Sequence, residues 1–181
     1  MSTAGITRRV VVTGLGAVTP LGLTAGETWD SMVAGRSGVG PVTLFDASAF
    51  PVRIAAEVKG FDAAAIFGKR RARHLDRFAQ FALVASREAI ADATLDVAAA
   101  PERVGVVYAS GIGGLGTLER EIGVLRDRGP EWVSPYMCPM MIANIAAGEI
   151  AMELGATGPN SCTVTACAAS AHAIGDGYDM I

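Results

Sequence analysis

The sequence predicts an α/β fold, with a mainly parallel or mixed sheet that carries helices on both faces. Three observations support this prediction. β-branched apolar runs typical of buried strands occur at Val10–Thr13, Val104–Ala109 and Ser161–Thr165. Between the first two runs, apolar residues recur at three- and four-residue steps from Phe78 to Ala89, which is the period of a helix. Glycine-rich turns follow the first two strands, so strands and helices alternate along the chain.

The predicted helices have recognisable ends. In chain order they span Ala25–Ala34, Arg73–Ala93, Thr117–Arg128, Met140–Leu154 and the residues from Cys167 onward. Thr24 caps the first helix, and Glu27 three residues later completes a capping box. Gly129 and Pro130 end the third helix. Residues 36–59 read as loops with short extended pieces.

The composition is that of one globular domain with a buried core. Of the 181 residues, 51% are hydrophobic and 18% are charged, which is too apolar for a disordered chain. The formal net charge of −3 argues against nucleic acid as the main partner. No apolar run reaches the roughly 18 residues that a membrane-spanning helix needs. We therefore expect neither nucleic acid nor a membrane as a partner.

The three cysteines, Cys138, Cys162 and Cys167, are odd in number and lack the spacing of metal ligands. This pattern favours a reduced cytoplasmic protein over a disulfide framework or a zinc site, and we expect no metal and no cofactor. Thr7-Arg8-Arg9 resembles the start of a twin-arginine export signal. Because glycine and proline interrupt the apolar run that follows, we interpret this segment as two solvated arginines before the first strand.

Gly111–Gly116 is a literal G-x-G-x-x-G motif between a predicted strand and a predicted helix, which is the context of a dinucleotide-binding loop. The helix then leads into Gly129–Pro135, which contains no second buried strand ending in a ribose-binding acid. A turn whose glycines let the backbone pack closely is the favoured interpretation. Gly14-Leu15-Gly16 is a weaker match, since Thr19 stands where the motif has its third glycine.

Cys167 says more about function than any other residue. An extended, β-branched run stops at this cysteine, and an alanine-rich run typical of a helix starts from it. A thiol at such a turn is exposed at the end of a sheet and faces the positive end of a helix dipole. Both effects favour the nucleophilic thiolate. Taken alone, the local pattern fits a buried structural cysteine better, so the flanking sequence has to decide between the two.

Several segments resemble β-ketoacyl-acyl-carrier-protein synthases, in the order in which that family has them. They are Arg9–Gly16 with Thr19–Gly22, Ser110–Gly114, Ser134–Met137 and, as the active-site signature, Gly158–Ser170. The resemblance covers essentially the whole chain and is closest to the elongating type II synthase of bacterial fatty-acid synthesis. It implies a thiolase-like αβαβα layered fold of two pseudo-symmetric halves, of which residues 1–181 form the N-terminal domain.

The resemblance also implies a reaction. Cys167 accepts an acyl chain from acyl carrier protein as a thioester. Malonyl carrier protein then loses carbon dioxide, and its carbanion attacks that thioester to give a 3-oxoacyl chain two carbons longer. The backbone N–H of Cys167 serves as one oxyanion donor. The second donor, two histidines and a lysine belong to the family's second half, at positions that this sequence does not contain.

The resemblance assigns further residues by position. Ile112 corresponds to the residue that gates the acyl pocket. Met137 corresponds to one that lines the pocket from the partner subunit of a homodimer, whose interface forms across the strand before Cys167. The basic residues near His74 fit a solvated helix face and a docking surface for the acidic carrier protein equally well. The first candidates for docking are Lys69, Arg70 and Arg73.

The remaining reactive side chains are expected to be structural. His172 lies five helical steps from Cys167, about 140° around the helix, so it is not expected to act as the base for the thiol. Cys162 is expected in the core, and Cys138 is expected to be buried or in a pocket wall.

Ile181 ends the sequence inside a predicted helix, so we expect a fragment of a longer protein. One alternative function is that of a polyketide ketosynthase or another thiolase-like acyltransferase. Another is a non-catalytic module that binds a dinucleotide or a carrier protein. Acylation of Cys167 would separate the enzymes from the non-catalytic module.

Overall fold

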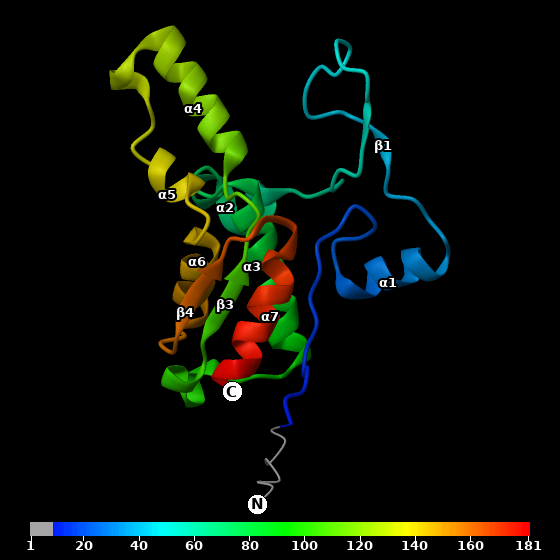
Figure 1. Ribbon diagram of the computed structural model, residues 1–181, viewed down its shortest axis with the longest axis vertical. Coiled ribbons are helices and arrows are strands. Elements are labelled where there is room, and N and C mark those ends of the chain that lie inside the picture. Colours follow the sequence, from blue (N-terminus) through cyan, green and yellow to red (C-terminus); the bar gives the residue numbers. More distant parts are fainter. Residues whose placement is uncertain (1–8) are drawn as a thin grey trace, which may run out of the picture.

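The computed structural model describes residues 9–181 as a mixture of helices and short strands. The helices are α1 (Ala25–Val33), α2 (Ala63–Ala72), α3 (Arg77–Asp92), α4 (Leu115–Arg128), α5 (Met137–Met141), α6 (Ile145–Leu154) and α7 (Ala169–Met180). The strands are β1 (Gly40–Pro41), β2 (Ile54–Ala55), β3 (Val106–Ala109) and β4 (Asn160–Thr163). In Figure 1, β3 and β4 lie in the body of the molecule with α3, α6 and α7, while α4 and the loop at β1 extend from it.

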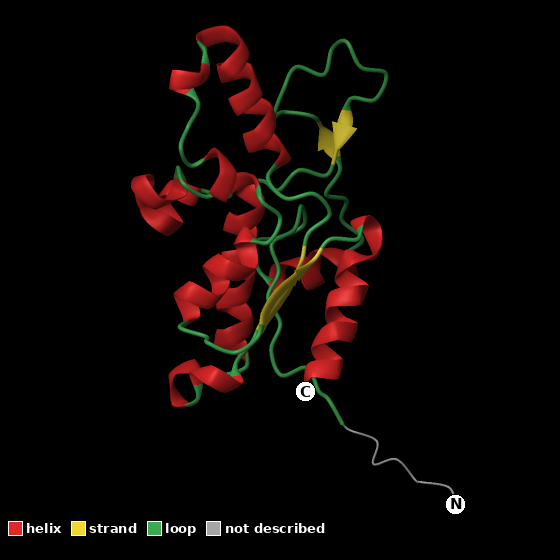
Figure 2. Cartoon of the chain, turned by 60° about the vertical axis from the view of Figure 1, so that its left-hand side comes forward, coloured by secondary structure: helices red, strands yellow, loops and turns green. Residues whose placement is uncertain are grey.

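The parallel strands β3 and β4 form the centre of the body, with Val106 opposite Asn160 in their register. Val106 packs into the core cluster that includes α6, whereas Val107 points to the α7 side. Figure 2 shows the two strands between helices on either side. β1 and β2 form a separate antiparallel pair. The structure thus confirms the α/β class and the helices on both faces of the central strands.

The core forms where α3 packs on α6. Ala79, Ala146 and Ala147 are fully buried, and their small side chains let the two helix backbones approach closely. Leu83 and Ile150 fill the space between them at 1% and 4% exposure. This apolar contact holds α6 against β3 and β4, and so fixes one face of the strand pair.

The helix predicted over Arg73–Ala93 starts later than expected. α3 begins at Arg77 because the side chain of Asp76 accepts a hydrogen bond from the Phe78 N–H and caps it there. The helix predicted over Met140–Leu154 is in fact two. Ile142 is extended, with ψ of 137°, and this separates α5 from α6.

The strand predicted at Val10–Thr13 is wrong for the described residues. The segment is not in a sheet, and Val12 is 80% exposed. The chain just after it lies along α3 instead, where the Leu15 and Ala17 N–H groups donate to the carboxylates of Asp92 and Glu88. Arg8 of the twin-arginine segment lies outside the described residues.

The capping box at the first helix is confirmed with one change. The Thr24 hydroxyl accepts from the Glu27 N–H at 3.1 Å, as predicted. The Glu27 carboxylate reaches the N–H of Leu23, one residue before the cap, at 2.7 Å. The Ala25 N–H, at the first residue of α1, donates to the Glu88 carboxylate at 2.9 Å, so a remote side chain adds to the local capping box.

An ion-pair cluster ties α2 and α3 to α6. Glu153 accepts from Arg87 and Arg71, and Arg71 also pairs with Glu149 at 3.2 Å. Hydrogen bonds from Arg87, and then from Arg71, hold the pKa of Glu153 below its ordinary value of 4.5. A carboxylate with a lowered pKa in the folded state stabilises the fold above its ordinary pKa, and this stabilisation is lost as the pH falls through the folded-state pKa.

The Glu153→Gln variant should therefore lose about 1 kcal/mol of folding free energy at neutral pH, because ion pairs between partly exposed side chains contribute on that order. The difference between wild type and variant should shrink below the ordinary pKa of 4.5. Urea unfolding at a series of pH values measures it, with the exposed Glu119→Gln as the matched control. A difference that stays constant down to strongly acidic pH would contradict the assignment.

Candidate functional site

Cys167 lies at a sharp turn between β4 and α7. The chain leaves β4 after Thr163, and residues 166–168 form one 3-10 turn that runs directly into α7. Ala166 has φ of +50°, in the left-handed region that a non-glycine residue rarely adopts. The Cys167 side chain is exposed. The predicted placement of this thiol, exposed at a strand-to-helix turn, is confirmed.

The start of α7 leaves its first backbone N–H groups without a side-chain cap. Its N-cap residue is Ala168, which offers no side-chain acceptor. The positive end of the helix dipole is therefore open beside the cysteine. An anion or an oxyanion that forms next to Cys167 would be stabilised there.

Two side-chain hydrogen bonds join the turn to α7. The Thr165 hydroxyl lies 2.8 Å from Nδ1 of His172, and the Thr163 hydroxyl donates to the Asp176 carboxylate at 3.0 Å. His172 thus contacts the residue two before Cys167, which agrees with the expectation that it is structural. Sequence patterns did not reveal these bonds, although His172 and Asp176 are spaced four apart on one helical face.

The glycine loop after β3 lies at the same end of the strands as Cys167, because the two strands are parallel. The Ser110 N–H donates to the Thr163 carbonyl at 3.2 Å, and the Gly113 N–H donates to the Ser110 hydroxyl at 2.9 Å. Ile112, between them, is 67% exposed. The structure therefore brings Ile112 and Cys167 to one edge, from two strands that are far apart in sequence.

The glycines of this loop serve close packing. Gly113 has φ of +89°, and an added Cβ would lie 2.5 Å from the Met141 carbonyl oxygen. An added Cβ at Gly114 would lie 2.5 Å from the Met140 carbonyl oxygen. After α4 come a 3-10 turn and α5, with no strand of a dinucleotide-binding unit in this described stretch. These observations favour the packing interpretation over the dinucleotide module.

Met137 begins α5 and is half-buried. Just before it, the Tyr136 ring stacks on His74, with centroids 3.8 Å apart. At the other end of α5, the Met141 carbonyl accepts from the Gly114 N–H at 2.9 Å. α5 therefore links Met137 to the base of the Ile112 loop. No contact between Met137 and Cys167 is described within residues 9–181.

The basic cluster divides into exposed and engaged side chains. Arg71 pairs with Glu149 and Glu153, and Arg77 donates to the Val58 carbonyl at 2.9 Å. The three residues chosen as docking candidates are exposed, and within residues 9–181 they form no ion pair: Lys69, Arg70 and Arg73.

The other two cysteines differ from each other. Cys162 packs against the core, its thiol donates to the Ala143 carbonyl at 3.3 Å, and burial raises its pKa. Cys138 is exposed, so of the two expected placements the buried one is wrong, and the pocket wall stays a prediction. Cys138 lies on the short helix α5, in which Met140 is buried and the Cys138 side chain is exposed. All three cysteines are free thiols.

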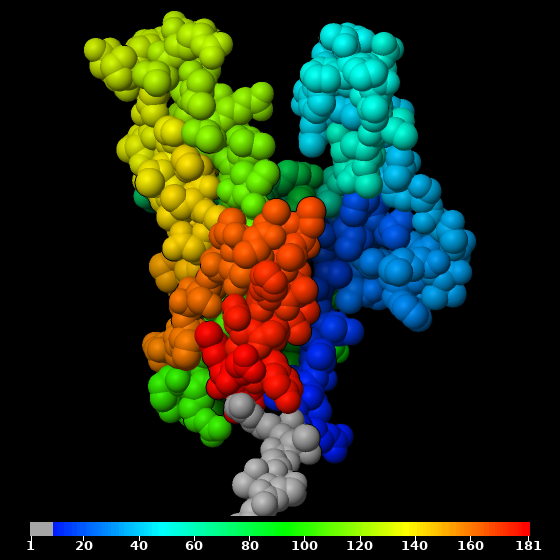
Figure 3. Space-filling model, in the orientation of Figure 1, coloured from blue at the N-terminus to red at the C-terminus, as the bar shows by residue number. Residues whose placement is uncertain are grey.

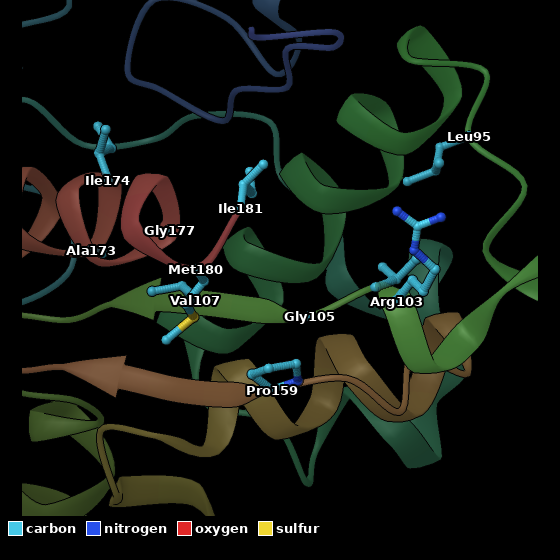
Figure 4. A pocket seen from close by; sticks show the side chains of 11 residues that line it. Leu95, Arg103, Gly105, Val107, Pro159, Ala173, Ile174, Gly177, Met180 and Ile181 are labelled. Atoms are coloured by element: carbon cyan, nitrogen blue, oxygen red, sulfur yellow. The ribbon is translucent and has the colours of Figure 1, made fainter. Parts of the chain in front are cut away.

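A cavity of about 550 Å³ lies away from this edge. Figure 4 shows it between β3 and α7, with Val107, Ala173 and Ile181 in its lining. Gly105 and Pro159 place it at the amino ends of the strands, whereas Cys167 follows the carboxyl end of β4.

In the space-filling view of Figure 3, the region where α7 begins (orange) lies below α4 and the segment around β1.

Two findings concern membranes and metals. Within residues 9–181, no helix is long and apolar enough to cross a membrane. In the same part of the chain, no three His, Cys, Asp or Glu side chains gather in a way that could hold a metal ion.

The chain resembles known proteins over nearly its full length. Residues 7–181 match the family described as β-ketoacyl synthase, N-terminal domain. The chain is 50% identical over 175 residues to 3-oxoacyl-[acyl-carrier-protein] synthase 2 of Synechocystis sp., a match that covers 96% of this chain and 42% of that protein. The protein of the same name from Staphylococcus aureus is 42% identical over 175 residues, with the same coverage.

A solved structure supports the same relationship. The ishigamide ketosynthase/chain length factor matches with a TM-score of 0.85 and 30% identity, over 95% of this chain and 43% of that chain. The likeness confirms the predicted fold class, the N-terminal half of a thiolase-like fold. The chain spans about two fifths of the length of the curated relatives that it matches.

Proposed function

Because this chain belongs to the β-ketoacyl synthase family, we propose that it carries the acyl-accepting cysteine of a 3-oxoacyl-[acyl-carrier-protein] synthase. The observation that carries the proposal is the exposed Cys167 on a strained turn before the uncapped start of α7. Relatives that are 42% to 50% identical have this enzyme's name. We propose that residues 1–181 form its N-terminal domain, in a cytoplasmic protein.

The proposed reaction has two steps that share Cys167. The Cys167 thiolate attacks the acyl thioester, forming a new carbon–sulfur bond, and the carrier's thiol leaves with a proton. Malonyl carrier protein then loses carbon dioxide, its carbanion forms a carbon–carbon bond to the acyl group, and Cys167 sulfur is the leaving group. The Cys167 N–H at the helix start would bind the oxyanion in both steps.

The full-length protein tests this function. Supplied with acyl carrier-protein thioester, it should first show a mass increase on Cys167 that corresponds to the acyl group. When malonyl carrier-protein thioester is added, it should release carbon dioxide and form a 3-oxoacyl chain two carbons longer. If neither the acylated cysteine nor the product forms with any chain length, the proposed function is wrong.

A polyketide ketosynthase is the second candidate, because the chain is 30% identical to a ketosynthase/chain length factor. The 50% identity to a 3-oxoacyl-carrier-protein synthase favours fatty-acid elongation. The product separates the two functions. A keto group retained over repeated condensations on one chain would favour the polyketide function, and a single condensation would favour elongation.

We further propose that the acyl pocket is completed in a homodimer. β4 pairs with β3 along one edge, and no described strand within residues 9–181 covers its other edge. Pairing of two β4 edges would join two copies across the strand before Cys167, with Ile112 and Met137 at the pocket. Sedimentation of the full-length protein tests this proposal, and a monomer at working concentration would contradict it.

We propose that acyl carrier protein docks on Lys69, Arg70 and Arg73. The proposal is supported by two observations: the three side chains are exposed, and within residues 9–181 none of them forms an ion pair. Their charges are therefore available to an acidic partner. Reversing all three to glutamate should raise the KM for acyl carrier protein about tenfold and leave kcat little changed, because surface charges act mainly on encounter.

Steady-state kinetics measure this change at low and high salt. The matched control is Arg36→Glu, an exposed charge reversal on a distant loop. An equal rise in KM for the control, or an effect that persists in high salt, would show that these three residues are not the docking surface.

A further inference from the structure

Asp76 caps two helices with one carboxylate. Its Oδ1 accepts from the Phe78 N–H at 3.3 Å, at the start of α3. Its Oδ2 accepts from the Thr117 hydroxyl at 2.5 Å and from the Thr117 N–H at 3.2 Å, in the first turn of α4. Asp76 and Thr117 are 41 residues apart. The two helix starts are therefore held together by one side chain.

α4 depends on this remote cap. Its own N-cap residue is Gly114, which has no side chain to accept from the first-turn N–H groups. Thr117 is 1% exposed, so water cannot replace a lost partner. A buried N–H or hydroxyl without an acceptor is strongly unfavourable. The place where α4 begins is thus set by Asp76 rather than by the sequence at its own start.

The start of α4 in turn sets the loop that carries Ile112. At one end, Ser110 is held to β4 through the Thr163 carbonyl. At the other end, Gly114 donates to the Met141 carbonyl at 2.9 Å, and its Cα stands so close to Asp76 that an added Cβ would lie 3.0 Å from Oδ2. The loop spans only the few residues between these two anchors, and Ile112 is at its exposed middle.

We propose that Asp76 is a positioning residue for Ile112, and through it for the length of acyl chain that Cys167 accepts. This inference rests on the proposed function. Asp76 does not touch the reacting atoms. It fixes the base of the loop, and this fixes the distance between Cys167 and Ile112, the proposed gating residue. Loss of the Oδ2 contacts would free the loop while α3 keeps its cap.

The Asp76→Asn substitution separates these two roles. Asparagine caps a helix as well as aspartate, so α3 is retained, but its amide has one acceptor oxygen instead of two. In the full-length variant, the ratio of kcat/KM between the best and the worst acyl chain should fall about tenfold, which is within the range that pocket fit controls. The matched control is Asp62→Asn, which caps α2 alone through Ala65.

A second pair of variants, at Thr117, distinguishes loss of the Asp76–Thr117 hydrogen bond from a general folding defect. Thr117→Val keeps the shape of the side chain but removes its hydroxyl, and should reproduce the flattened chain-length profile. Thr117→Ser keeps the hydroxyl and should retain the wild-type profile. Hydrogen exchange at residues 110–117 should become faster in Asp76→Asn and Thr117→Val, and stay unchanged in Asp62→Asn.

The two readouts distinguish the possible failures. Unchanged exchange and an unchanged chain-length ratio in Asp76→Asn would overturn the inference. A uniform fall in kcat/KM for every chain length would overturn it as well, because that is what a purely structural role produces. If wild type never acylates Cys167 while exchange responds as expected, the proposed function and the chain-length role have failed, and only the positioning of the Ile112 loop by Asp76 stands.

Discussion

The Cys167→Ser variant should lose condensation activity by about a thousandfold or more, as expected when a covalent nucleophile is replaced. Serine keeps the size of the side chain on the strained turn, but its hydroxyl is a far weaker nucleophile than a thiolate without an adjacent base. The Nδ1 of His172 is bonded to the Thr165 hydroxyl at 2.8 Å, which agrees with a structural role for this histidine. Initial rates with acyl and malonyl carrier thioesters, and the mass of the Cys167 peptide, measure the loss.

The other cysteines supply the controls for this prediction. Cys138→Ser changes an exposed thiol and should leave the rate within about twofold, as expected for a surface substitution. Cys162→Ala removes a half-buried thiol and should lower stability rather than acylation, because that thiol packs on the core. Acyl label that moves to another residue in Cys167→Ser, with activity kept, would show that Cys167 is not the nucleophile.

The Gly16→Ala variant should destabilise the fold by about 3 kcal/mol, which is the upper range for overpacking. An added Cβ at Gly16 would lie 1.9 Å from the Ala85 carbonyl oxygen and 2.8 Å from the Ala89 backbone nitrogen, both in α3. These are backbone atoms of a core helix and cannot rotate away. Relief requires the N-terminal segment to leave α3, with loss of the Ala17 hydrogen bond to Glu88.

Gly26→Ala is the control for this prediction. Gly26 lies in α1, and nothing lies within 4 Å of an added Cβ there. Alanine should raise stability slightly at such a helical position, by about 0.5 kcal/mol. Urea unfolding curves of the full-length proteins measure both changes. Equal stability of Gly16→Ala and wild type would mean that the N-terminal segment does not pack on α3 as described.

Much of the candidate site was predictable because its signals are local. The β-branched run before Cys167 and the alanines after it are adjacent in sequence, and they place a thiol at a strand-to-helix turn. The capping box at Thr24 likewise needs only residues within one helical turn. The roles of Cys167, Ile112 and Met137 stay predictions, since they come from the family resemblance.

The predictions that the structure contradicts fail because of contacts with residues that are distant in sequence. Val10–Thr13 has the composition of a buried strand, but the carboxylates of Glu88 and Asp92 on α3 bind the backbone that follows it. The predicted long helix at Met140–Leu154 breaks where the glycine loop of another segment packs against it. In both places a partner more than 25 residues away in sequence decides the local conformation.

The sequence by itself determined the α/β class, the turn that presents Cys167 and the family, because short-range propensity and a specific signature carry that information. Only the tertiary structure decided which basic residues remain exposed, why the glycines are needed and how one aspartate caps two helices. Arg71 and Lys69 are nearly neighbours in sequence, yet only Arg71 pairs with α6. Such differences depend on which distant backbone or side chain lies opposite each residue, and that arrangement is settled only when the helices pack.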